Sequence, residues 1–119
     1  MLTKFYFKFC IFIVNQRDKY IASLIRSRIK DVDKTAKVVL YGSRARGTSQ
    51  KSSDWDVLVL LDIKNVDVKT EQIFRHSLFD LELEIEEPIS VFVYSINQWE
   101  SKYRVTPFYK NVKREGIVL

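Results

Sequence analysis

Residues 38–61 read VVLYGSRARGTSQKSSDWDVLVLL, two apolar runs joined by a polar stretch. The first run, residues 38–41, has the β-branched composition of a short strand, and Gly42 stops it. The second run, residues 54–61, is apolar on both faces beyond Asp56, which is typical of a strand covered on both sides. The stretch therefore predicts two strands with a chemically distinctive segment between them.

The turn after the first strand is suited to binding an anion. Gly42 lets the backbone approach a ligand closely, and N–H groups at the start of a helix or tight turn favour phosphate. Ser43 adds a hydroxyl donor, and Arg44 and Arg46 add positive charge beside the same turn. Taken alone, these residues would more often form a solvated loop.

Two carboxylates begin the second strand. Asp54 and Asp56 flank Trp55, and the two-residue period of a strand directs both toward one face, with Cα atoms about 6.5–7 Å apart. Two hard oxygen ligands at this spacing suit Mg²⁺ that arrives with a nucleotide's phosphates. An isolated Asp-x-Asp is usually strand-end charge, but the pair here follows Gly42–Ser43 after ten residues, and that combination is far more specific.

Helical and strand patterns alternate around this core. Asn15 and Asp18 resemble a weak capping box at the start of a helix over residues 16–30. Residues 89–94 (ISVFVY) have the composition of a third strand. The apolar face of the expected helix consists of Ile21, Leu24, Ile25 and Ile29.

The C-terminal region carries clear signals for two short helices. Ser95 and Gln98 form a capping box that opens the first helix. Thr106–Pro107 and Gly116 are the N-cap, first-turn proline and C′ glycine of the second.

Residues 79–86 (FDLELEIE) are ambiguous, because they alternate as a strand does. An alternative helical face includes Phe74, Leu78, Leu81 and Ile85. The periodicity alone leaves both open. Since no repeat or linker interrupts the chain, residues 15–119 are expected to form one mixed α/β domain.

Residues 1–14 are an extra apolar segment. Its run FYFKFCIFIV is too short for a membrane span, which needs about 20 residues. It also lacks a small-residue cleavage site. We expect a buried extra strand or packing arm; the alternatives are an export or membrane role and a segment upstream of the natural start.

Composition bounds the function classes. With 119 residues, 46% of them hydrophobic, the chain can bury one core. The lone Cys10 and lone His76 exclude an internal disulfide and a Cys/His zinc site, and the cytoplasm is the expected compartment. The net charge of +5 favours a phosphate-bearing partner, but without a recognition motif we expect no direct nucleic-acid binding.

The Gly42–Ser43 turn followed by Asp54-x-Asp56 resembles the signature of the DNA polymerase beta-like nucleotidyltransferase superfamily. The wording of residues 38–61 is similar to its minimal nucleotidyltransferase (MNT) branch, and the resemblance extends from about residue 16 to the end. It implies an α/β (α+β) fold, in which a small mixed sheet carries helices on one face and the nucleotide on the other. It also favours a helix over residues 69–85.

The resemblance implies a role for each matching residue. Gly42 and Ser43, with Arg44 and Arg46 beside them, would bind the nucleotide's phosphates, and ATP is the expected nucleotide. Asp54 and Asp56 would be the catalytic carboxylates that hold Mg²⁺.

The family's third acid, a metal ligand that also helps to deprotonate the acceptor, aligns with Ser90. A serine is neutral and cannot replace it in either role. One of the acids Glu82, Glu84, Glu86 and Glu87 could take the place of the third acid. The alternative is that these four residues form a solvated acidic face.

Two functions follow from the resemblance. One is Mg²⁺-dependent transfer of AMP from ATP to a hydroxyl on a partner protein, as in MNT antitoxins paired with HEPN toxins. The acceptor would come from another subunit, because one small domain leaves no room for an acceptor-binding domain. The expected partners are the nucleotide, a HEPN-type protein and further copies of this chain in a homo-oligomer. The other is an MNT-like antitoxin or nucleotide-binding module with little chemistry.

Overall fold

The computed structural model describes residues 16–50 and 52–119. In this part of the chain, four strands form one sheet in the order β3-β2-β1-β4. β1 pairs antiparallel with both β2 and β4, and β2 pairs parallel with β3, so the sheet is mixed as predicted. The strands are β1 (Lys37–Tyr41), β2 (Trp55–Leu61), β3 (Ile89–Ser95) and β4 (Ile117–Val118).

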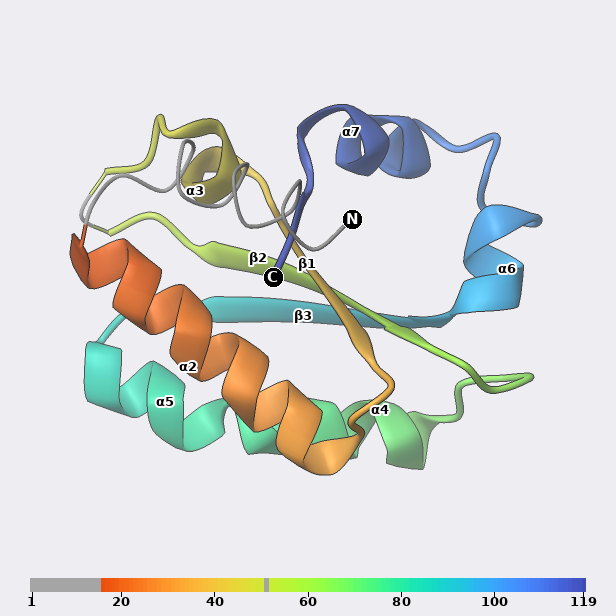
Figure 1. The fold of residues 1–119 in the computed structure, drawn as a ribbon, viewed down its shortest axis with the longest axis horizontal. Coiled ribbons are helices and arrows are strands. Elements are labelled where there is room, and N and C mark those ends of the chain that lie inside the picture. The colour runs from red at the N-terminus through yellow and green to blue at the C-terminus, as the bar shows by residue number, and fades with distance from the viewer. Residues whose placement is uncertain (1–15, 51) are drawn as a thin grey trace.

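Three helices cover one face of the sheet: α2 (Gln16–Val32), α4 (Val68–Ser77) and α5 (Phe79–Ile85) (Figure 1). Alternate residues of β2 point into this layer, because side chains along a strand alternate between its faces. The predicted amphipathic helix is confirmed, and its Ile21, Ile25 and Ile29 are buried in the same core. The β2 residues in that core are Trp55, Val57, Val59 and Leu61.

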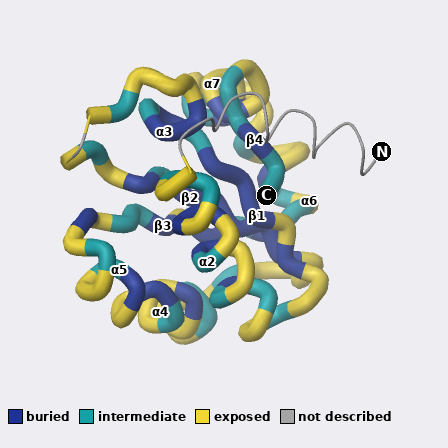
Figure 2. Tube along the Cα trace, turned by 60° about the vertical axis from the view of Figure 1, so that its left-hand side comes forward, coloured by how far each residue is buried: buried dark blue, intermediate teal, exposed yellow. Residues whose placement is uncertain are grey.

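The opposite face is covered only in part, by α6 (Ile96–Glu100) and α7 (Pro107–Glu115). Leu58 and Leu60 of β2 pack there against Trp99, Tyr109 and Val112. The fold is the expected one, with these two short helices as an addition on the second face. Figure 2 shows the strands as the buried centre and the helices with exposed outer sides.

The ambiguous segment is helical. Leu81 of α5 is fully buried between the helices and the sheet, as are Phe74 and Leu78, so burial of the helical face decided the conformation. The implied helix over residues 69–85 is two helices, which meet at Leu78 (φ −102°, ψ −5°).

The predicted helix starts in the C-terminal region are confirmed. The Ser95 Oγ accepts the N–H of Gln98 at 3.0 Å, and the Thr106 Oγ1 accepts the N–H of Tyr109 at 3.2 Å. The Gln98 side chain does not complete the capping box by reaching back, since its amide donates to Asn65 Oδ1 at 2.9 Å.

Gly116 follows α7 as predicted, but not for the reason expected of a C′ glycine. Its φ is −66°, which any residue adopts. A Cβ there would lie 2.5 Å from the Val112 carbonyl oxygen and 2.9 Å from Val39 Cγ1. The close approach of this residue to the last turn of α7 and to Val39 of β1, and not a left-handed backbone, requires the glycine.

The predictions for residues 1–14 and for Asn15 lie outside the described residues. Within the described ranges, every helix is too short or too polar to cross a membrane.

Candidate functional site

A pocket of about 440 Å³ opens where β1 ends and β2 begins. It contains five of the six residues predicted from the sequence: Gly42, Ser43, Arg46, Asp54 and Asp56. The turn and the carboxylates, predicted separately from local patterns, therefore share one cavity. Its remaining lining residues are Tyr41, Ser53, Phe108, Asn111 and Glu115.

The two aspartates lie on the same side of the β2 strand. Asp54 precedes the first strand residue and is exposed, while Asp56 is half-buried and pairs with Tyr41 of β1. Trp55 between them is fully buried in the helix-covered core. Strand alternation thus separates a buried aromatic anchor from the two carboxylates.

The electrostatics of this pocket favour a cation. Burial raises the pKa of Asp56, and repulsion from Asp54 and then from Glu115 adds to the rise, while Arg46 opposes it. A cation beside these carboxylates would relieve the repulsion that raises this pKa. Asp54 and Asp56 therefore fit a divalent cation in charge and in donor type.

Gly42 is held against the Asp56 carboxylate. Its backbone (φ 76°, ψ −160°) lies in a region that is essentially restricted to glycine. A Cβ at this position would lie 2.1 Å from Asp56 Oδ2. The Gly42 carbonyl accepts the N–H groups of Ala45 and Arg46, which begins the one-turn helix α3 (Ser43–Arg46). The glycine is needed because turn and carboxylate meet here, a contact that the sequence did not reveal.

Ser90 is directly opposite Asp56 in the parallel pairing of β2 with β3. Residues paired in this way project to the same face, so Ser90 occupies the position from which an acid would reach Asp56. In residues 16–50 and 52–119, no three His, Cys, Asp or Glu side chains group closely enough to hold a metal ion. A Mg²⁺ ion here would depend on two carboxylates together with the phosphates of its nucleotide.

The acids before β3 do not replace the missing one. The Glu82 Oε1 accepts the backbone N–H of Ile89 at 3.0 Å, and Glu87 is buried in an ion cluster. Glu84 and Glu86 are exposed, in keeping with a solvated acidic face.

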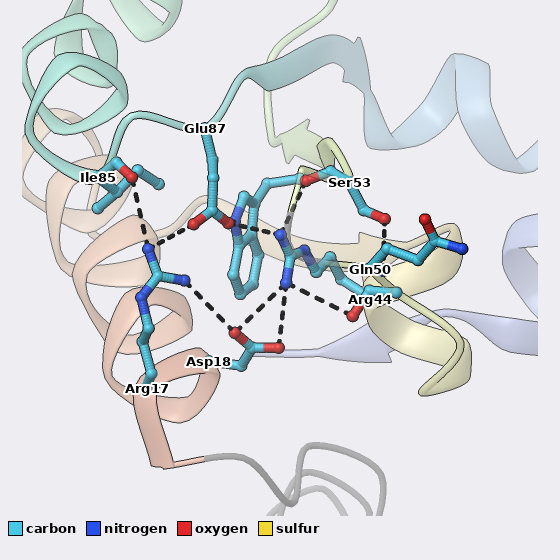
Figure 3. Close-up of polar contacts among 9 residues, drawn as sticks. Arg17, Asp18, Arg44, Gln50, Ser53, Ile85 and Glu87 are labelled. Carbon is cyan, nitrogen blue, oxygen red and sulfur yellow. Dashed lines mark hydrogen bonds and ion pairs between the residues drawn. The ribbon is translucent and has the colours of Figure 1, made fainter.

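Arg44, the sixth predicted residue, lies away from the pocket. Its side chain is 4% exposed and contacts Glu87 (2.5 Å) and Asp18 (3.3 Å), as Figure 3 shows. It also donates to the Ser53 carbonyl at 2.9 Å and lies 4.7 Å from the centre of the Trp55 ring. The structure therefore does not bring Arg44 together with the other five predicted residues, and the contacts of its side chain join parts of the fold.

Helix geometry explains why the two arginines diverge. Residues two apart on a helix are about 200° apart around its axis, so Arg44 and Arg46 leave α3 on nearly opposite sides. Arg44 enters the protein, where it links α3 to α2 and to the start of β3. Arg46 is half-exposed in the pocket and contacts Glu115 at 3.1 Å.

Helix α7 supplies three lining residues that the sequence analysis missed. Phe108, Asn111 and Glu115 are spaced three and four apart, so they share one helix face. That spacing was the available signal. The Phe108 ring is 5.3 Å from that of Tyr41, and burial raises the pKa of the Tyr41 hydroxyl, which keeps this wall of the pocket uncharged.

Comparison with known proteins agrees with this geometry. The family model described as nucleotidyltransferase domain matches residues 22–118. A solved chain described as "Crystal structure of the toxin-antitoxin with AMP-PNP" has 21% sequence identity and a TM-score of 0.55. The alignment covers 85% of this chain and 70% of that one, and it shows a shared fold. No curated protein matches this chain.

The family match covers most of the chain and includes the whole sheet, the pocket and α7. It confirms the resemblance that the Gly42–Ser43 turn and the Asp54-x-Asp56 pair indicated. The chain belongs to the nucleotidyltransferase domain family.

Proposed function

We propose that this protein binds ATP with Mg²⁺ and transfers AMP to a hydroxyl group on a partner protein, as an MNT-type antitoxin. The observation that carries the proposal is the meeting of an anion-binding turn and two carboxylates in one pocket of about 440 Å³. The acceptor oxygen forms a bond to the α-phosphorus, the bond to the bridging oxygen breaks, and pyrophosphate and one proton are released.

The five predicted residues that line the pocket each have a part in this scheme. Gly42 and Ser43 donate hydrogen bonds to the phosphates, and Arg46 adds positive charge beside them. Asp54 and Asp56 hold the metal ion. When bound, Mg²⁺ would supply neutralisation of the leaving pyrophosphate and activation of the attacking hydroxyl. The aromatic wall restricts water on one side of the pocket.

The biological setting is part of the same proposal. A toxin–antitoxin structure with AMP-PNP shares the fold, which supports a nucleotide-dependent role beside a partner protein. We infer a HEPN-type partner in the cytoplasm, with the acceptor hydroxyl on that partner.

One observation favours a second candidate function. Ser90 faces Asp56 at the position where a third acid would complete the site. A site with two carboxylates can hold nucleotide and metal without an efficient base for the acceptor. The alternative is an MNT-like nucleotide-binding antitoxin that does little chemistry.

Calorimetric titration with ATP, with and without Mg²⁺, tests the shared part of both candidates. We expect Asp54→Asn and Asp56→Asn to lose the Mg²⁺-dependent binding. Asp62→Asn is the matched control, since Asp62 is exposed and follows the opposite end of β2. Equal binding by wild type and all three variants would reject the metal site.

Labelled ATP then separates the two candidates. The protein is incubated with Mg²⁺, ATP labelled at the α-phosphate, and the protein encoded by the adjacent gene. Label on the partner that depends on Asp54 supports the transferase. Binding of nucleotide without label transfer supports the binding module.

A further inference from the structure

The phosphate turn of this structure already holds an anion from the chain itself. Glu115 is the last residue of α7, and its Oε1 accepts the backbone N–H of Gly42 at 3.2 Å, across 73 residues of sequence. The same carboxylate contacts Arg46 Nη1 at 3.1 and 3.3 Å. The Glu115 side chain is 15% exposed, so it lies within the pocket and not in bulk solvent.

The Gly42 N–H and Arg46 are two of the three groups that the proposed function assigns to the phosphates of the nucleotide. A backbone N–H has a single hydrogen, so a phosphate oxygen and the Glu115 carboxylate compete for the one on Gly42. Two anions at the same donors also repel each other, most strongly where water is partly excluded. Glu115 and a bound phosphate group therefore exclude each other from this position.

We propose that Glu115 is a displaceable plug, which occupies the phosphate position until nucleotide binds and then leaves it. The proposal rests on the proposed function in one respect, that the Gly42 turn is where phosphates bind. Arg46 is suited to exchange partners, because its side chain is 49% exposed and can follow the incoming phosphate.

A supporting role for Glu115 would change the affinity for anions in the opposite direction. If Glu115 instead held the Gly42 turn in its binding conformation, its removal would weaken the binding of anions. A plug predicts that removal strengthens it. The direction of the change in affinity therefore decides between them.

Titration with two probes, MgATP and tripolyphosphate without nucleoside, tests the plug on the full chain. We expect Glu115→Ala to bind both about tenfold more tightly than wild type, because a charged hydrogen bond and an ion pair no longer compete. Glu115→Gln should give a smaller gain, since its amide oxygen can still accept from Gly42. Glu71→Ala is the control, because it removes a similar carboxylate–arginine pair on α4, with Arg75.

The outcomes separate the inference from the function on which it rests. If the wild type binds the probes and Glu115→Ala binds them equally or more weakly, the plug is overturned and the proposed function is kept. Equal gains in Glu115→Ala and Glu71→Ala also overturn the plug, because net charge alone would then explain them. Failure of both probes to bind wild type and every variant rejects the phosphate turn itself.

Discussion

Replacing Glu87 by glutamine probes the charge cluster formed by Arg17, Asp18, Arg44 and Glu87. The Glu87 side chain is 5% exposed and accepts hydrogen bonds from Arg44 (2.5 Å) and from the Trp55 indole (3.0 Å), and it also pairs with Arg17. Glutamine keeps the shape and loses the charge. The substitution therefore leaves the Arg44 guanidinium, 4% exposed, without its nearest carboxylate.

Removing one partner of a buried ion pair costs about 3–5 kcal/mol, because the other charge stays desolvated. Asp18 still contacts Arg44 at 3.3 Å, and the new amide oxygen can accept one hydrogen bond. The cost should therefore lie at the lower end of this range. We expect a loss of about 3 kcal/mol in the free energy of unfolding. With an m-value of about 1.5 kcal/mol/M, the urea midpoint falls by about 2 M.

Urea unfolding followed by tryptophan fluorescence measures this loss, with Glu86→Gln as the exposed neighbouring control. The double variant Arg44→Met, Glu87→Met should lose less than the sum of its single variants. Each single variant leaves a buried charge without its partner, whereas the double variant removes both charges of the pair. A loss for Glu87→Gln within about 0.5 kcal/mol of the control would refute this account of the cluster.

The same residue predicts a dependence on pH. Burial would raise the pKa of Glu87, but hydrogen bonds from Arg17 and Trp55 and the charge of Arg44 outweigh it, so the pKa is lowered. A lowered pKa stabilises the fold above the ordinary glutamate value of about 4.3, and this is lost as the pH falls through the folded value. The difference in stability between wild type and Glu87→Gln should therefore shrink below about pH 4. An unchanged difference down to pH 2 would contradict the cluster's role.

Three further substitutions test the pocket. Gly42→Ala should lower the free energy of unfolding in urea by about 1–3 kcal/mol, because the backbone of Gly42 has a conformation that is costly for other residues. It should also weaken MgATP binding, because the new Cβ would displace the Asp56 carboxylate, and an unchanged affinity would contradict this contact. Asp56→Asn should raise the melting temperature without metal, because it removes a carboxylate whose pKa burial and Asp54 raise; a lower melting temperature would contradict that sign. Ser90→Asp should tighten Mg²⁺ binding or increase transfer, because Ser90 is opposite Asp56. The exposed control Ser101→Asp should do neither. A folded Ser90→Asp protein that behaves like the control would show that Ser90 is not the third-acid position.

Local patterns account for what could be predicted. The β2 strand follows from an apolar run of residues, and the two-residue alternation of a strand places exposed Asp54 and half-buried Asp56 on the side opposite the buried Trp55. The helix starts at Ser95 and Thr106 follow from hydrogen bonds that span three residues. Such short-range preferences can be predicted from a sequence because the interacting residues are only a few positions apart along the chain.

The helical conformation of residues 79–85 shows where local patterns stop. The alternating and helical patterns were both present, and the periodicity did not choose between them. Burial of Leu81 against the sheet decided in favour of α5, with the break at Leu78 that a single helix would not have. The choice depends on the surface that the rest of the chain offers.

The sequence by itself determined β1, β2 and β3, but not the short β4, together with the turn at Gly42, the Asp54-x-Asp56 pair and the family to which they belong. Only the tertiary structure decided that Arg44 is buried while Arg46 faces the pocket, and that Glu115 closes on the Gly42 turn. The partners of these side chains come from segments 43 and 73 residues away. Local sequence patterns do not predict contacts between residues so far apart in the chain, because these contacts form only when the sheet and its helices pack together.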